Sequence, residues 1–424
     1  MVMAGSDFTI APELVERFHA SRAAARALTT ASSSLRDAAL QAIQESVSAH
    51  AAQIITSNAE DLQRGAADGM EESLQDRLRL TQERVQGLAD SVGVIRSLPD
   101  PVGDVIREMT LQNGLHVTQV RVPFGVIGAI YEARPNVTVD ITALALKSGN
   151  AVVLRGGGAA LESNKVLVSL MRDALTSVGL PADAVTTVDD WGREGAQALM
   201  KGRGFIDVLI PRGSASLIET VVTESSVPVI ETGSGIVHIF VDATASAEQA
   251  VEIIHNAKVQ RPSVCNSVET VLVHQDALGL VPAIAERLVA SGVTLHADEA
   301  IRELVPTAVP ATEEDWATEY LSLDLSLKVV ATLDEALEHI RTYSTQHTES
   351  ILTADMANAE RFLTEVDSAA VMVNASTRFT DGGEFGFGAE VGISTQKLHA
   401  RGPMGLPELT STKWIVRGQG QIRH

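Results

Sequence analysis

The sequence predicts an α/β protein in which a doubly wound parallel sheet is followed by a second α/β alternation. The first observation is that, from residue 125 onward, short apolar runs alternate with segments of helical periodicity. The second is the length of these helical segments, which suits the right-handed crossovers that join parallel strands. The third is composition, since 45% hydrophobic and 21% charged residues among 424 are typical of a folded chain of about two or three domains.

The first hundred residues are predicted to be helical. Ser34 and Asp37 have the spacing of a capping box, and Leu40, Ile43 and Val47 then fall on one helix face. This region therefore supplies helices that precede the first strand.

Residues 107–122 interrupt the helical pattern with two β-like runs around Asn113 and Gly114. Asn-Gly is the strongest short hairpin signal. A hairpin that projects from helices is either an arm that contacts another subunit or a plain surface ribbon, and the sequence leaves both open. The tail, 380–424, is rich in glycine and proline and has no clear long element before the run KWIVRG.

Two successive alternations of strands and helices follow the hairpin. In the first, we expect strands at 125–131, 151–155, 184–188, 206–210 and 227–230, and helices at 138–150, 163–178, 193–200 and 214–224. In the second, we expect strands at 236–241, 268–273, 327–332, 350–353 and 370–374, and helices at 246–257, 277–291, 334–343 and 355–366. The most polar and least periodic stretch, 306–319, is expected to be a surface excursion.

Charge and cysteine content exclude several classes of protein. The 33 Lys and Arg against 54 Asp and Glu give a net charge of −21, which argues against nucleic acid or an anionic membrane as a partner. One cysteine, Cys265, excludes an internal disulfide and a zinc site of several thiolates, and the histidines form no metal-binding motif. Without a secretory signal pattern or a long apolar run, the chain is expected to be cytoplasmic.

Four loops at the expected carboxyl ends of strands are candidates for ligand binding, because open parallel sheets bind ligands there. They are 131–134, 155–158, 211–214 and 231–233. Glycines let the backbone approach a phosphate, and the helix that starts at Ser214 offers free N–H groups to an anion. No loop has the G-x-G-x-x-G or G-x-x-x-x-G-K-[ST] pattern, so an ordinary strand–helix turn remains the alternative for each.

Cys265 lies in the segment VQRPSVCNSVE, in a loop between a helix and a strand. A lone cysteine is most often a small buried apolar side chain. Arg261 and Asn266 are unusual neighbours for a core residue, and a nearby guanidinium favours the thiolate, which attacks carbonyl carbon. Cys265 is therefore a candidate nucleophile, and no adjacent histidine supports a Cys–His pair.

Several stretches together resemble the aldehyde dehydrogenase superfamily. They are the E-T-G turn at Glu231, the run PFGVIGAI before GNAVVLR, the run RPSVCN around Cys265 and the run ISTQKLHARGPMGL. The resemblance implies an aldehyde-dehydrogenase-like fold of three parts: an NADP-binding domain of 1–106 and 124–232, a catalytic domain of 233–400 with Cys265, and an oligomerisation element made of the β-hairpin arm 107–123 and the tail 401–424.

The resemblance is strongest to the branch of the superfamily that reduces an acyl phosphate. It implies NADPH-dependent reduction of L-glutamyl 5-phosphate to L-glutamate 5-semialdehyde in proline biosynthesis, through a thioester on Cys265. It also implies a homo-oligomer. A glutamate 5-kinase is a candidate partner, and the sequence leaves open whether it passes its product directly.

The resemblance assigns roles to individual residues. Cys265 matches the nucleophile, and Glu231 matches the general base of the superfamily, although an enzyme that releases an aldehyde has no water to activate. Asn136 lies two residues from the position where the oxyanion asparagine is expected. The residues that match cofactor contacts are Arg155, Gly156, Gly157, Gly213, Ser214 and Glu319, the last on the nicotinamide ribose.

The implied substrate carries an α-carboxylate and a phosphate, whereas the protein is strongly acidic. Local cationic groups must therefore reverse the electrostatic field around the substrate. We predict Arg134, Arg261 and Arg378 as substrate-binding residues, because a guanidinium fork suits either anion. The alternative for Arg261 and for Arg378 is a structural ion pair.

Two other functions remain open on the sequence alone. A cysteine acyltransferase or hydrolase would use Cys265 without a nicotinamide cofactor. A non-catalytic relative would bind ligands without turnover. The presence of Cys265 together with loops that carry arginine and glycine argues against the hypothesis of a non-catalytic binding protein.

Overall fold

The computed structural model describes residues 8–132 and 134–423, and these form two compact units. Unit 1 consists of the residues up to Glu231, of Phe387–Gly392 and of the residues from Met404 onward, and unit 2 consists of Thr232–Gly386 and Ile393–Pro403. The chain passes between the units four times, and each sheet in the described part of the chain lies within one unit. The three-part division predicted from the sequence stays a prediction.

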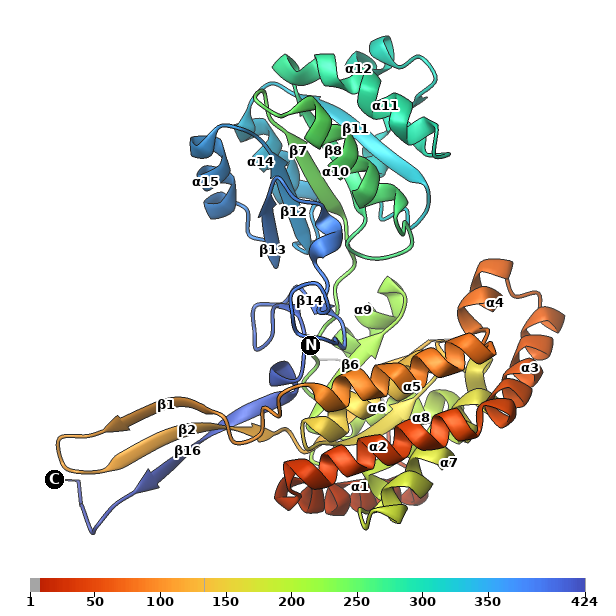
Figure 1. Cartoon of the computed structure of the whole chain (residues 1–424), viewed down its shortest axis with the longest axis vertical. Helices are drawn as coiled ribbons and strands as arrows, with labels where there is room; N and C mark the ends of the chain where they lie inside the picture. The colour runs from red at the N-terminus through yellow and green to blue at the C-terminus, as the bar shows by residue number, and fades with distance from the viewer. Residues whose placement is uncertain (1–7, 133, 424) are drawn as a thin grey trace, which may run out of the picture. The chain divides into compact units, whose positions relative to one another are not determined.

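Unit 1 contains the N-terminal helices, a parallel sheet and an antiparallel arm (Figure 1). Its helices are α1 (Pro12–Thr30), α2 (Ser33–Ala49), α3 (Ala51–Ala67), α4 (Glu72–Leu78), α5 (Gln82–Ser97), α6 (Pro135–Lys147), α7 (Leu161–Ser177), α8 (Gly192–Lys201) and α9 (Ala215–Glu224). Its strands are β1 (Val105–Thr110), β2 (His116–Pro123), β3 (Val126–Tyr131), β4 (Ala151–Arg155), β5 (Val185–Thr187), β6 (Val208–Arg212) and β16 (Thr410–Arg417). Among the described residues, no helix combines the length and the apolar character needed to cross a membrane.

The predicted helical region at the N-terminus is confirmed, with a correction at one cap. Leu40, Ile43 and Val47 are fully buried on one face of α2. The predicted capping box at Ser34 is wrong, because α2 begins at Ser33 and Ser32 is its N-cap. The extended backbone of Ser32 places its hydroxyl to accept a hydrogen bond from the N–H of Leu35.

The parallel sheet of unit 1 has the strand order β5-β4-β3-β6. Four of the five strands expected in the first alternation are confirmed, and the strand expected at 227–230 does not form. That segment makes one isolated bridge, between Leu209 and Val229, because Pro228 has no N–H with which to continue a ladder. Helix α6 begins at Pro135, earlier than expected, since proline is well tolerated in the first turn.

The predicted hairpin is confirmed, and the tail adds a third strand to it. Strands β1 and β2 are antiparallel, and Gly114 in their connection has a φ of 85°. Strand β16 pairs antiparallel with the other edge of β2, with Trp414 opposite Gln119. Figure 1 shows these strands as an arm that extends from the helices of unit 1. A role of the arm in oligomerisation stays a prediction.

Unit 2 is built on a parallel sheet with the strand order β10-β9-β11-β8-β7-β12-β13. Its strands are β7 (Val237–Val241), β8 (Val268–His274), β9 (Thr294–Ala297), β10 (Val309–Pro310), β11 (Asp324–Val330), β12 (Thr348–Leu352) and β13 (Ala370–Val373), with the short pair β14 (Ile393–Ser394) and β15 (Gly402–Pro403). Its helices are α10 (Ala247–Val259), α11 (Val281–Val289), α12 (Glu299–Leu304), α13 (Glu313–Trp316), α14 (Leu333–Tyr343) and α15 (Met356–Glu365).

The second predicted alternation is confirmed, except around residues 306–319. This stretch is not a plain surface excursion, because it contains β10 and α13 and buries Trp316. Strand β9 and helix α12, which precede it, were also not expected. Each of these elements is too short to show a period in the sequence.

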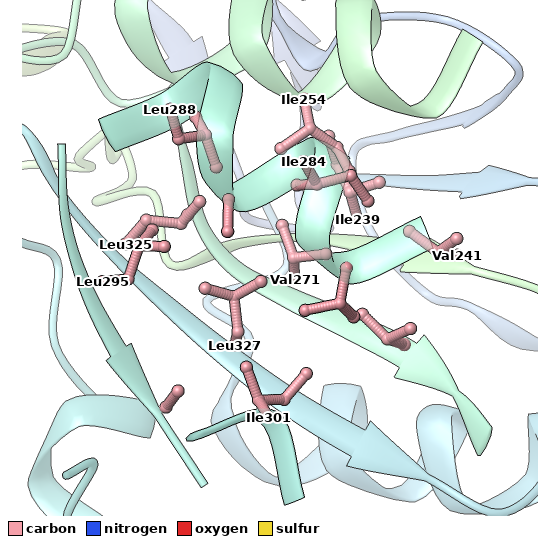
Figure 2. Packing of buried hydrophobic residues seen from close by; sticks show 14 of the residues in the cluster. Ile239, Val241, Ile254, Val271, Ile284, Leu288, Leu295, Ile301, Leu325 and Leu327 are labelled. Atoms are coloured by element: carbon pink, nitrogen blue, oxygen red, sulfur yellow. The ribbon is translucent and has the colours of Figure 1, made fainter. Parts of the chain in front are cut away.

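The core of unit 2 has one apolar layer on each face of its sheet. Ile239 of β7 and Val271 of β8 pack with residues of α10 and α11 in the cluster that Figure 2 shows. Phe240 and Leu272, the next residues along the same strands, pack with residues of α14 and α15. Successive residues of a strand point to opposite faces, so apolar runs here indicate strands that are buried on both sides.

Candidate active site

The carboxyl ends of β3 and β4 in unit 1 lie beside a pocket of about 510 Å³. Residues of α8 and α9 complete its lining. Arg155, predicted to contact the cofactor, is part of this lining. Arg193, in the first turn of α8, is a second guanidinium of the pocket that sequence reasoning missed. The lining also includes the carboxylates of Glu132 and Glu224. Arg155 and Arg193 are the groups that could pair with a phosphate, and the apolar wall suits a flat ring.

The N-terminus of α9 holds a carboxylate in this structure. Ser214, its N-cap, donates from its backbone N–H and its hydroxyl to the two oxygens of Glu132, at 3.0 and 2.8 Å. A β-carbon on Gly213 would lie 2.8 Å from both the Glu132 carboxyl carbon and Leu217 Cδ2, so a larger residue there would have to displace one of these side-chain ends. Ser214 thus holds an anionic group at the start of α9, and a helix N-terminus is also a place where a diphosphate can bind. Contacts of Gly213 and Ser214 with a cofactor stay predictions.

Gly156 is enclosed by a network of buried polar side chains. Its backbone N–H donates to Oδ1 of Asp189 at 2.6 Å, and burial raises the pKa of Asp189. A β-carbon on Gly156 would lie 2.1 Å from Nδ2 of Asn164. Gly157 follows in extended backbone and precedes a short 3-10 turn. Close packing against Asn164 therefore explains why position 156 is a glycine. Contacts of Gly156 and Gly157 with a cofactor stay predictions.

Three further predicted residues belong to unit 1. Arg134 and Asn136 are exposed at the start of α6, and Asn136 Nδ2 lies 3.4 Å from a carboxylate oxygen of Asp140. Glu231 is the last residue of the first segment of unit 1. Cys265 belongs to unit 2, so the roles of Arg134, Asn136 and Glu231 beside the nucleophile stay predictions.

Cys265 lies in a turn, residues 260–267, between α10 and β8, which we call the nucleophile turn. The thiol-bearing residue is half-buried. Its neighbour Asn266 donates from Nδ2 to the carbonyl of Thr380 at 2.9 Å, and the hydroxyl of Thr377 donates to the carbonyl of Asn266 at 2.7 Å. The turn is therefore anchored immediately after Cys265, which leaves the cysteine accessible on a fixed backbone.

Glu319 is connected to the nucleophile turn through Gly235. Oε1 of Glu319 accepts a hydrogen bond of 2.7 Å from the backbone N–H of Gly235, whose α-carbon lies against the carbonyl of Cys265. Burial raises the pKa of Glu319, and the hydrogen bond from Gly235 opposes that shift. The structure thus brings a predicted cofactor residue to the segment beside the predicted nucleophile.

Arg378 lies within electrostatic range of both Arg261 and Cys265. Burial lowers the pKa of Arg378, the Arg261 guanidinium lowers it further, and the charges of Asp381 and Cys265 raise it. Arg378 donates from Nε to Gln260 at 3.0 Å and lines a pocket of about 190 Å³. The Arg378 guanidinium therefore brings positive charge near the thiol, in a pocket that Asp381 and Glu384 also line.

Comparisons with known proteins extend over most of the chain. The sequence model of the aldehyde dehydrogenase family matches residues 12–323. The γ-glutamyl phosphate reductase of Leifsonia xyli subsp. xyli is 63% identical over 99% of this chain and 100% of its own. The crystal structure of γ-glutamyl phosphate reductase from Thermotoga maritima has a TM-score of 0.95 at 47% identity, covering 97% of this chain and 100% of that one. An acetylating aldehyde dehydrogenase from Geobacillus thermoglucosidasius shares the fold, with a TM-score of 0.70 at 17% identity over 97% of this chain and 98% of its own.

Proposed function

The chain belongs to the aldehyde dehydrogenase family, and from this membership we propose that it reduces L-glutamyl 5-phosphate to L-glutamate 5-semialdehyde with NADPH and releases phosphate. The observation that carries the proposal is the similarity to γ-glutamyl phosphate reductases over nearly the whole chain. Family membership confirms the predicted fold class and the predicted class of oxidoreductase, and it implies a nicotinamide cofactor.

Cys265 is the nucleophile in this proposal. Its thiolate attacks the acyl carbon of the substrate, a bond forms between Sγ and carbon, and the bond from carbon to the phosphate oxygen breaks. The phosphate leaves and a thioester remains on Cys265. After reduction, the tetrahedral carbon expels the thiolate, which releases the aldehyde and restores Cys265. The chain has one cysteine, so no other thiol can take this role.

The nicotinamide cofactor supplies the hydride that reduces the thioester. The pocket between α8 and α9 fits its adenosine end, because Arg155 and Arg193 line it and the N-terminus of α9 lies at the adjacent strand ends. Of the four charged side chains that line the pocket, Arg155 and Arg193 are proposed to pair with the 2′-phosphate that distinguishes NADPH. Glu319, on the segment hydrogen-bonded to Gly235, is proposed to hold the nicotinamide ribose.

The substrate's anionic groups are proposed to bind Arg261 and Arg378 near the thiol, with Arg134 as a third contact. The oxyanion of the tetrahedral intermediate requires preorganised donors. The backbone N–H of Cys265 is the first of these, and Asn136 is proposed as the second. Glu231 is given no step, because the product is released as an aldehyde and no water has to be activated.

A mixed anhydride of a carboxylate and phosphate is labile, so a reaction that phosphorylates the side-chain carboxylate of glutamate must supply it nearby. We propose a glutamate 5-kinase as that partner. A thiol nucleophile must stay reduced, which favours the cytoplasm as the compartment. The three-stranded arm is proposed to join subunits of a homo-oligomer.

The test runs the reaction in reverse, with glutamate 5-semialdehyde, phosphate and NADP, and follows the near-ultraviolet absorbance of the reduced nicotinamide. We expect an increase that requires all three components and is faster with NADP than with NAD. An equal increase without phosphate would indicate a hydrolytic aldehyde dehydrogenase. No reduction of NADP would favour a cysteine acyltransferase or a non-catalytic relative, and NADP binding would separate these two.

A further inference from the structure

A buried ion pair joins the two ends of the nucleophile turn. Lys258, the penultimate residue of α10, donates from Nζ to Oε2 of Glu269, the second residue of β8, at 2.6 Å. Both side chains are 0% exposed. Burial raises the pKa of Glu269 to about 7 and lowers the pKa of Lys258, and each shift is opposed by the partner's charge. The pair therefore closes the stem of the turn that carries Cys265.

The second oxygen of Glu269 contacts the segment that carries Glu319. Oε1 accepts a hydrogen bond of 3.2 Å from the backbone N–H of Leu321, which has a φ of 55°. A left-handed backbone is costly for leucine, so this hydrogen bond helps to hold it. Glu319 in turn accepts from Gly235, and Gly235 lies against the carbonyl of Cys265. These contacts therefore run from Glu269, at one end of the nucleophile turn, through the segment 319–321 and Gly235, and return to the turn at Cys265.

The chain of contacts spans the amino ends of three neighbouring strands. Gly235 precedes β7, Glu269 lies at the start of β8, and Leu321 precedes β11. The strand order is β11-β8-β7 and all three strands are parallel. The three segments therefore meet at the amino ends of these strands. Glu269, on the central strand, contacts Lys258 at the end of α10 and Leu321 ahead of β11.

We propose that Glu269 is a positioning residue for hydride transfer, because its two oxygens fix the nucleophile turn relative to the segment that carries Glu319. The inference rests on the proposed function, in which Cys265 carries the acyl group and Glu319 holds the nicotinamide ribose. Loss of the carboxylate would change the distance between the acyl carrier and the hydride donor. The thiol itself would stay in place, since Asn266 anchors the turn separately.

The test compares Glu269→Gln with Asp242→Asn in the full chain. Asp242 is also a buried carboxylate of unit 2, but it follows β7 at the opposite edge of the sheet, where it accepts hydrogen bonds from Thr353 and Asn358. For each variant, we would measure kcat and KM of phosphate-dependent NADP reduction and the isotope effect with semialdehyde deuterated at C5. The rate at which iodoacetamide alkylates Cys265 reports the state of the thiol.

We expect Glu269→Gln to lower kcat at least about tenfold and to raise the isotope effect, with KM for the semialdehyde and the alkylation rate within about twofold of the wild type. Asp242→Asn is expected to keep the wild-type isotope effect. If this variant only destabilises the fold, less enzyme is active, but the step that limits turnover in each active molecule is unchanged. Glu269→Asp keeps the charge but reaches less far, so it is expected to show a smaller change in the same direction. This variant also serves as the test should Glu269→Gln not fold.

A wild-type isotope effect in the Glu269 variants, with kcat reduced only as much as in Asp242→Asn, would overturn the inference and leave the proposed function intact. A wild-type chain that reduces no NADP in the presence of phosphate would overturn the proposed function, and the inference with it.

Discussion

The α-carbon of Gly235 lies so close to the backbone of Cys265 that a β-carbon at position 235 would sit 1.5 Å from the Cys265 carbonyl oxygen. The neighbour is backbone rather than the end of a flexible side chain. No rotamer change can therefore make room, and any larger residue at position 235 must displace the nucleophile turn.

Gly235→Ala is expected to lower phosphate-dependent NADP reduction by about a hundredfold, because a displacement of about 1 Å at a reacting group has an effect of this size. Overpacking should also destabilise unit 2 by roughly 1–3 kcal/mol. Gly279→Ala is the matched control, since a β-carbon there meets nothing within 4 Å. Thermal unfolding and steady-state rates measure both effects, and equal activity of the two variants would contradict the close contact.

Cys265→Ser is expected to retain less than about a hundredth of wild-type turnover, a loss of more than roughly 2.7 kcal/mol of transition-state stabilisation. A serine hydroxyl is a weak nucleophile without an adjacent base. NADPH binding, measured by fluorescence titration, should be unchanged because Cys265 is not part of the pocket between α8 and α9. Turnover above that limit would rule out the thioester route.

Arg378→Lys is expected to raise KM for glutamate 5-semialdehyde about tenfold or more, because one charge-assisted hydrogen bond contributes roughly 1.5–3 kcal/mol. KM for NADP should stay constant. Arg341→Lys provides the control, since Arg341 is an exposed residue of unit 2 that pairs with Glu338 and Glu365. A change in KM for NADP with an unchanged semialdehyde KM would place Arg378 in the cofactor site instead.

Glu132→Gln is expected to tighten NADPH binding about two- to fivefold. The carboxylate now bound at the N-terminus of α9 competes with the cofactor's diphosphate, and a charge at such a site is worth about 0.3–1 kcal/mol. Glu219→Gln makes the same charge change on the exposed face of α9 and should leave the dissociation constant unchanged. Weaker binding in Glu132→Gln would show that Glu132 supports the cofactor rather than competing with it.

His347 is expected to make unit 2 sensitive to acid. Burial lowers the pKa of His347 to about 4 in the folded chain, whereas an unfolded histidine titrates near 6.5. The stability that comes from keeping His347 neutral is therefore complete above about pH 6.5 and is lost as the pH falls toward 4.

The measurement is urea unfolding of His347→Gln and of the wild type at pH 7 and pH 5. The wild type should lose about 2 kcal/mol more than the variant over this interval. His50→Gln, an exposed change in unit 1, should follow the wild type. Parallel pH dependences of His347→Gln and the wild type would show that another group dominates the acid response.

Much of the fold can be predicted because most elements are long enough to show their own period. Strands β3 and β7 and the helices that follow them are examples. The elements that were predicted wrongly or missed also have local causes. Pro228 ends a ladder that its apolar neighbours suggest, and β10 has only two residues. A pattern of hydrophobicity contains no information on a missing N–H or on an element shorter than one period.

The candidate site is predictable to a different extent in each unit. In unit 1, the rule that ligands bind at the carboxyl ends of parallel strands leads directly to Arg155 and Ser214. In unit 2, Cys265 and Gly235 precede their strands, so they lie at the amino edge, where that rule does not apply. The pairing of Lys258 with Glu269 depends on the burial of both side chains, which only tertiary packing produces.

The arm acquires its third strand late in the life of a nascent chain. Gln119 and Thr412, whose side chains are hydrogen-bonded between β2 and β16, lie 293 positions apart. At about 5–20 residues per second, a ribosome needs roughly 15–60 s to synthesise the segment between them. During this interval the β1–β2 hairpin presents an unpaired edge that can capture a foreign strand. Any subunit contact that needs the completed arm is therefore made after translation of unit 2, and chaperones that shield nascent edges have that interval in which to act.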